Sequence, residues 1–108
     1  MGFVKLTRVK TEYAGESITE AISRTDGAVW DSELSAKYTL YTNDGSEVAA
    51  DVLARSTDDK QFLLKVSKTI TAPLDGRYLL LVELVNSTDT DISDVIAEYN
   101  ITFLKRKG

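Results

Sequence analysis

Apolar residues recur at every second position along most of this chain. The runs that alternate in this way are Phe3–Val9, Ser17–Arg24, Tyr38–Tyr41, Val48–Leu53, Gln61–Val66 and Val95–Phe103. Successive side chains of a β-strand point to opposite faces of its sheet, so a period of two predicts half-buried strands. The run Tyr78–Val85 is apolar on both faces, which predicts a central strand.

Turn-forming residues separate the predicted strands. They are Asp26-Gly27, Asn43-Asp44-Gly45, Ser56–Asp59, Pro73–Gly76 and Asn86–Asp91. The second of these predicts a hairpin, because Asn, Asp and Gly tolerate a positive φ.

Two segments, Ser32–Lys37 and Asp91–Glu98, also allow a short helical turn. We interpret the second as a strand because the alternation continues to Phe103. About seven strands with a turn roughly every ten residues predict an all-β, two-sheet antiparallel sandwich. The length suits one domain over residues 1–108. The predicted core residues are Tyr38, Leu40, Phe62, Leu64, Tyr78, Leu80, Val82, Tyr99 and Ile101.

Composition argues against enzymatic chemistry. The chain has no histidine and no cysteine, so it lacks the usual general base, thiolate nucleophiles and disulfides. The net charge of −4 argues against a nucleic-acid footprint. The longest apolar run, Tyr78–Val82, is too short to span a membrane. We therefore expect a protein that is not an enzyme and that uses no cofactor, small-molecule substrate, nucleic acid or membrane.

The acidic loop near the end of the chain is a candidate calcium site that we weigh and set aside. Asp89, Asp91 and Asp94 could supply carboxylate oxygens, but their spacing departs from the EF-hand pattern and no glycine is present. A solvated turn is the better interpretation, as it is for Asp58 and Asp59. We therefore expect no metal site.

The segment Leu74–Leu80 resembles the corner before strand F of immunoglobulin-like domains. In that corner a glycine makes the turn two residues before a tyrosine, whose hydroxyl bonds to upstream backbone. Gly76 and Tyr78 occupy these places. Leu80 stands where antibody domains have a cysteine, so the disulfide of that branch is absent. The resemblance implies an immunoglobulin-like sandwich.

The wider strand layout is similar to that of small immunoglobulin-like proteins of tailed bacteriophage virions. The segments that carry this likeness are Val4–Leu6, Tyr38–Tyr41, Asp44-Gly45, Arg55-Ser56, Gly76–Tyr78 and Asp94–Ile101. Head-decoration, head–tail joining and tail accessory proteins have such layouts. The resemblance implies a structural subunit of a virion, assembled in the bacterial host cytoplasm, that contacts other virion proteins and copies of itself.

Bacterial surface-adhesin repeats share this layout, so an adhesion or carbohydrate-binding module is the alternative. Those repeats are secreted and tandem, whereas this chain opens with Met1 and shows no signal segment, which favours the virion interpretation. The sequons at Asn86–Thr88 and Asn100–Thr102 carry no weight without such a signal.

Contacts with other proteins would use strand edges, loops and a few aromatic anchors. Edge strands leave backbone groups unpaired, and Phe3, Tyr13 and Trp30 are candidate anchors if they are exposed. Trp30 is also a candidate core residue, which is the interpretation we favour. The basic residues Lys105, Arg106 and Lys107 could touch an acidic partner surface or nucleic acid, but we interpret three charges at a chain end as a solubilising tail.

Overall fold

The computed structural model of the chain describes residues 6–24, 26–86 and 93–105. Its strands are β1 Leu6–Tyr13, β2 Ile18–Ser23, β3 Leu34–Thr42, β4 Glu47–Val52, β5 Ala54–Arg55, β6 Gln61–Val66, β7 Gly76–Asn86 and β8 Ser93–Leu104. A short helix, α1, spans Lys68–Thr71.

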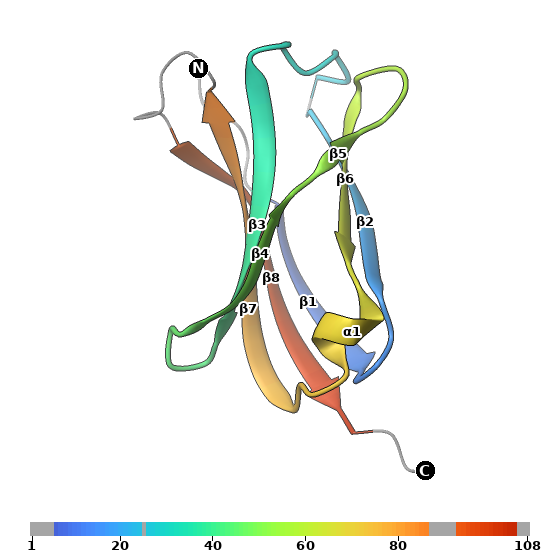
Figure 1. Cartoon of the computed structure of the whole chain (residues 1–108). Coiled ribbons are helices and arrows are strands. Elements are labelled where there is room, and N and C mark those ends of the chain that lie inside the picture. The colour runs from blue at the N-terminus through green and yellow to red at the C-terminus, as the bar shows by residue number, and fades with distance from the viewer. Residues whose placement is uncertain (1–5, 25, 87–92, 106–108) are drawn as a thin grey trace.

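The strands form two sheets that face each other (Figure 1). One sheet has the order β1-β8-β7-β3-β4, and the other has the order β2-β6-β5. β1 runs parallel to β8, and the other neighbouring strands are antiparallel. The fold is an immunoglobulin-like β-sandwich, which confirms the predicted fold class.

The core fills the space between the two sheets. Eight of the nine predicted core residues are buried there, and Tyr78 is partly buried against the same cluster. The Tyr78 ring packs edge-on against Phe103 with a centroid distance of 5.5 Å. β7 lies between β8 and β3, as predicted for the run that is apolar on both faces.

The corner before β7 also has the predicted geometry. Gly76 has a φ of 91°, a conformation that strains residues carrying a side chain. The backbone N–H of Asp75 donates a hydrogen bond to the Tyr78 hydroxyl, at 3.3 Å. The tyrosine therefore ties the start of β7 to the turn that precedes it.

The alternation in β8 breaks at a β-bulge that the sequence pattern does not reveal. Val82 pairs with Ala97, but the next residue, Glu83, pairs with Val95. Ile96 is the extra residue, so Ile96 and Ala97 are both buried and Val95 is 37% exposed. The assignment of Val95 to the same face as Ala97 is therefore wrong.

Three boundaries also differ from the expected ones. The helical turn considered for Ser32–Lys37 is wrong, because a turn from Asp31 to Leu34 leads directly into β3. β1 continues to Tyr13, since its residues pair with β8 along their whole length. The short helix was not predicted. Its residue Thr71 is buried and donates a hydrogen bond to the Glu16 carbonyl, so a tertiary contact holds it.

Candidate binding face

The outer face of the five-stranded sheet has an apolar centre. Tyr78, Leu80 and Val82 of β7 point into the core, so Leu79 and Leu81 point outward. An outer sheet face that meets only water normally carries polar residues. Two successive leucines at the outward positions of the middle strand depart from that rule.

Neighbouring strands extend this apolar centre. Leu79 lies between Tyr41 of β3 and Asn100 of β8 in the sheet register, and Asn100 is paired in turn with Val9 of β1. Val9 is 83% exposed. Leu81 lies between Thr39 and Glu98, one register step away. We call the surface formed by Val9, Tyr41, Leu79, Leu81 and Asn100 the β7 face. Tyr41, Leu79 and Leu81 are partly exposed on it, and Thr39 beside Leu81 is buried.

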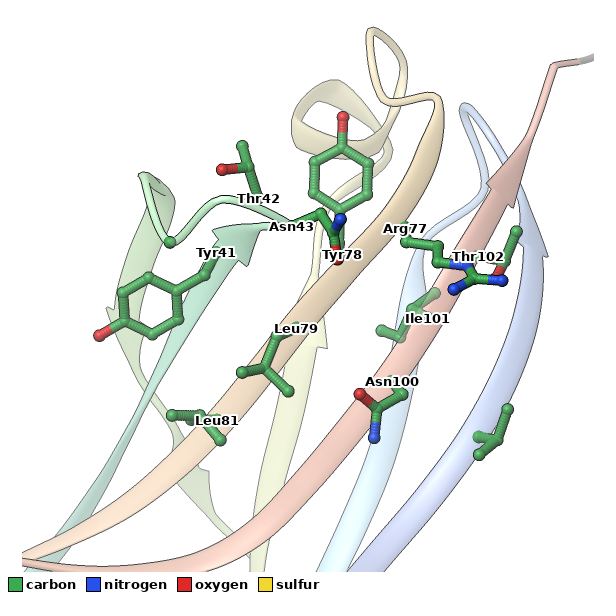
Figure 2. Close-up of a pocket in the computed structure, with 12 residues that line it drawn as sticks. Tyr41, Thr42, Asn43, Arg77, Tyr78, Leu79, Leu81, Asn100, Ile101 and Thr102 are labelled. Carbon is green, nitrogen blue, oxygen red and sulfur yellow. The ribbon is translucent and has the colours of Figure 1, made fainter.

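A shallow groove crosses the β7 face. Its lining includes Val9, Tyr41, Leu79, Leu81 and Asn100. Figure 2 shows Tyr41, Leu79, Leu81 and Asn100 on adjacent strands, with Arg77 and Thr102 at one end of the groove. An apolar floor with polar ends has the anatomy of a protein contact surface.

The hairpin between β3 and β4 forms a firm wall beside the groove. The Thr42 hydroxyl donates to the Asp44 carboxylate, and the Ser46 N–H donates to the same carboxylate oxygen at 3.2 Å. These hydrogen bonds hold the pKa of Asp44 below its ordinary value. Gly45 closes the turn with a φ of 93°, so the predicted hairpin is confirmed.

Charged residues lie at both ends of the β7 face. Arg77 is the outward residue before Leu79, and Glu83 is the outward residue after Leu81. Glu83 is paired in the sheet with Lys37 of β3. On the described outward positions of β8, β7 and β3, two cations (Lys37 and Arg77) balance two anions (Glu83 and Glu98). These three strands are therefore neutral on their outer side. Glu47 of the edge strand β4, which is paired with Tyr41, adds one negative charge at the margin, whereas the whole chain carries a net charge of −4.

The edge strand β4 is partly protected. Leu53, just beyond β4, donates its backbone N–H to Ala36 of β3, so the alternate residues Ala50 and Val52 direct their backbone groups away from the sheet. The Asp51 carboxylate accepts the Val52 N–H at 2.8 Å. This local bond competes with pairing to another strand. Contact through strand edges stays a prediction.

Trp30 is a core residue, so its alternative role as an interface anchor is wrong. Its side chain is 3% exposed, and its ring centroid lies 5.0 Å from that of Phe62. The indole N–H donates to the Ile22 carbonyl at 3.3 Å. Trp30 lies in the loop before β3, so this loop contributes an aromatic residue to the core.

Of the other candidate anchors, Tyr13 is exposed and Phe3 is not among the described residues. Tyr13 is 50% exposed at the end of β1, beside Leu104 of β8. Phe3 lies outside the described residues, as do Arg106 and Lys107 of the basic tail, whereas Lys105 is exposed.

The acidic candidates form turns in the described part of the chain. Asp58 accepts hydrogen bonds from the Ser56 hydroxyl and the Lys60 N–H, which lower its pKa. Asp59 pairs with Arg55 at 3.7 Å. Asp94 is exposed, and Asp89 and Asp91 lie outside the described residues. Within residues 6–24, 26–86 and 93–105, no group of three or more acidic side chains could hold a metal ion.

The two sequons lie at or within strands. Asn86 ends β7, and the rest of its sequon is outside the described residues. Asn100 is exposed on the β7 face, and Ile101 after it is buried. None of the described segments is a helix long and apolar enough to cross a membrane.

The β7 face was missed by sequence reasoning, although one signal for it was present. The run Tyr78–Val85 is apolar on both faces, which we interpreted as a strand covered on both sides. The structure places no second layer of the described residues over its outer side (Figure 1). The same signal therefore marks an apolar surface.

Comparisons with known proteins support the fold and leave the family open. No protein-family model matches the chain, and no curated protein matches it. A pullulanase from Group B Streptococcus superposes with a TM-score of 0.52 at 14% identity, over 88% of this chain and 10% of the pullulanase. Fibronectin(III)-like modules of Clostridium thermocellum CbhA superpose with a TM-score of 0.47 at 13% identity, over 96% of this chain and 94% of theirs.

This chain thus spans a tenth of the pullulanase, and the identity is too low to carry an activity from one protein to the other. The similarity shows a shared β-sandwich fold.

Proposed function

We propose that this chain is a non-catalytic protein-binding module that serves as a structural subunit of a bacteriophage virion. The β7 face is the surface that contacts another protein. The observation that carries this proposal is the pair of outward leucines, Leu79 and Leu81, on the central strand of a sheet face that no described segment covers.

Physical chemistry favours covering this face. Leaving apolar surface in water costs about 25 cal/mol per Å² relative to burying it, so a contiguous apolar strip favours association. The polar residues around the strip match the rim of a protein interface, where a few central side chains supply most of the binding energy. Leu79, Leu81 and Tyr41 are the proposed central residues.

The virion setting rests on the strand layout of the chain. The segments from Tyr38 to Ile101 resemble small immunoglobulin-like virion proteins, and the observed sandwich is compatible with that resemblance. In such a setting the protein needs a stable scaffold and a contact surface rather than a catalytic cleft.

The second candidate function is adhesion or carbohydrate binding. Its supporting observation is the groove itself, which is lined by the Tyr41 ring on one side and by the polar residues Asn100 and Arg77 on the other, with Asn43 in the adjoining hairpin (Figure 2). An aromatic ring and amide groups can stack on and hydrogen-bond to a sugar. The apolar floor made by Leu79 and Leu81 offers a sugar no hydrogen bonds, so we favour the protein partner.

The test is incorporation of the tagged chain into virions, measured by mass spectrometry of purified particles. The variant Leu79→Thr/Leu81→Thr should be lost from the particles while keeping its fold by circular dichroism. Leu63→Thr is the matched control, because Leu63 is a 39% exposed leucine on the other sheet. Failure of the unchanged chain to enter virions, with glycan binding that Tyr41→Ala abolishes, would support the second candidate instead.

A further inference from the structure

Four successive outward residues of β7 are complementary in charge to the same four residues taken in reverse order. In order they are Arg77, Leu79, Leu81 and Glu83, and the next outward residue, Val85, lies beyond this series. When the strand is reversed, a cation meets an anion at each end and leucine meets leucine in the middle. A surface that matches its own reversed copy is what a two-fold symmetric contact requires, because each residue meets its counterpart twice.

We propose that the partner covering the β7 face is a second copy of this chain. This inference rests on the proposed function and names the partner of the same surface. The two five-stranded sheets pack face to face about a two-fold axis that is perpendicular to β7 and lies between the sheets. Arg77 of each copy then lies opposite Glu83 of the other, and the four leucines meet at the axis.

The neighbouring strands fit this arrangement. Tyr41 and Thr39 share the register levels of Leu79 and Leu81, so Tyr41 of one copy lies opposite Thr39 of the other. Asn100 and Glu98 share the same two levels on β8, which places an amide opposite a carboxylate. Both are favourable contacts, and neither brings two like charges together.

Charge also selects this arrangement over the other two-fold possibility. An axis parallel to β7 would place Arg77 against Arg77 and Glu83 against Glu83, and like charges across an interface are strongly unfavourable. Because the outward positions of β3, β7 and β8 are neutral together, most of the net charge of −4 on each chain lies away from the centre of the contact. A second copy can therefore approach this face without meeting a like-charged surface.

The experiment measures the mass of the full chain by sedimentation equilibrium over a concentration series. The unchanged protein should form dimers. Arg77→Glu alone places two pairs of glutamates in contact, and Glu83→Arg alone places two pairs of arginines in contact. Each single variant should dimerise on the order of 30-fold more weakly. Lys65→Glu, an equal charge reversal on the outer side of the other sheet, should leave dimerisation unchanged.

Mixing the two single variants gives the sharpest result. In the mixed pair both contacts join a glutamate to an arginine, so a heterodimer should form from two weakly associating proteins. The double variant Arg77→Glu/Glu83→Arg should likewise recover its homodimer. These exposed changes should leave the thermal melt intact.

Several results would overturn the inference. They are a monomer at every concentration, single variants that dimerise as well as the unchanged chain, and mixed variants that do not associate. A strict monomer that still enters virions through Leu79 and Leu81 would overturn the inference and leave the proposed function standing. A chain that forms dimers through the β7 face but does not enter virions would overturn the proposed function and leave the dimer inference standing.

Discussion

At the residue scale, Tyr99 is the least satisfied group in the described core. Its side chain is 1% exposed, and its hydroxyl has no hydrogen-bond partner within the described part of the chain. Burial raises the pKa of Tyr99 to about 12, because the phenolate would lose its hydration; Glu20 adds to the increase and Arg8 opposes it. The ring therefore stabilises the core while the hydroxyl does not.

We predict that Tyr99→Phe unfolds at the same or a higher temperature at pH 7, because it removes a buried hydroxyl that lacks a partner. The folded pKa exceeds the unfolded value of 10, so the unchanged protein loses stability as the pH rises from about 10 to about 12. The variant should not show this part of the loss, which is about 2–3 kcal/mol.

The measurement is the free energy of unfolding in urea at pH 7 and at pH 11, where about half of this loss should be present. Tyr13→Phe, at a half-exposed position, is the control and should retain the alkaline loss. A neutral-pH loss of more than about 1 kcal/mol in Tyr99→Phe would show that the hydroxyl has a partner.

Arg55 gives a second prediction at this scale. Its guanidinium donates to the carbonyls of Trp30, at 2.9 Å, Asp31 and Leu34, and it lies 5.0 Å from the centre of the Phe62 ring. The loop that carries Trp30 is thus tied to the edge of the smaller sheet. Arg55→Lys keeps the charge but replaces the planar guanidinium, whose N–H groups reach three carbonyls, by a single ammonium group. We therefore expect it to cost about 2–3 kcal/mol of unfolding free energy.

Chemical denaturation checks the Arg55 prediction. Lys65→Arg, the reverse exchange at an exposed position on the outer side of β6, is the matched control and should change stability by less than about 0.5 kcal/mol. A small effect at both positions would mean that the loop holds its conformation without the guanidinium.

At the element scale, the corner before β7 separates a backbone effect from a side-chain effect. A Cβ at Gly76 would meet nothing within 4 Å, so a substitution there is opposed by its φ of 91° alone. Gly76→Val should cost at least about 2 kcal/mol, since a β-branched residue resists this conformation. Tyr78→Phe should cost about 0.5–1 kcal/mol, through one partly solvated hydrogen bond. Thermal melts of both variants provide the comparison, and equal tolerance would show that the corner is not a strained turn.

Alternation along the chain predicted most strands, because one face of each is buried and the other is not. It could not predict the bulge at Ile96, where an extra residue shifts the register against β7. Helix α1 was also beyond such reasoning. Its sequence Lys-Thr-Ile-Thr favours a strand by propensity, and a contact between Thr71 and distant Glu16 holds it in place.

At the whole-molecule scale, the β7 face shows the limit of local pattern. The leucines at 79 and 81 were visible in the sequence, but a run that is apolar on both faces predicts equally a covered strand and an exposed apolar strip. Only the strand order places Tyr41 and Asn100 beside Leu79 and leaves the outer side open. The composition alone, with no histidine and no cysteine, showed that the chain has no imidazole base and no thiolate nucleophile.

The most direct test of the proposed binding surface uses the lack of cysteine in the natural chain. Val9→Cys places a single thiol on the β7 face at an 83% exposed position, and Leu63→Cys places one on the outer side of the other sheet. The rate of maleimide labelling is measured for the free protein, diluted until sedimentation shows a monomer, and for the same protein in purified virions. We predict that labelling at position 9 slows by about 10-fold or more in the particle while labelling at position 63 is unchanged. Equal rates at position 9 in the two states would contradict the claim that the β7 face is a binding surface.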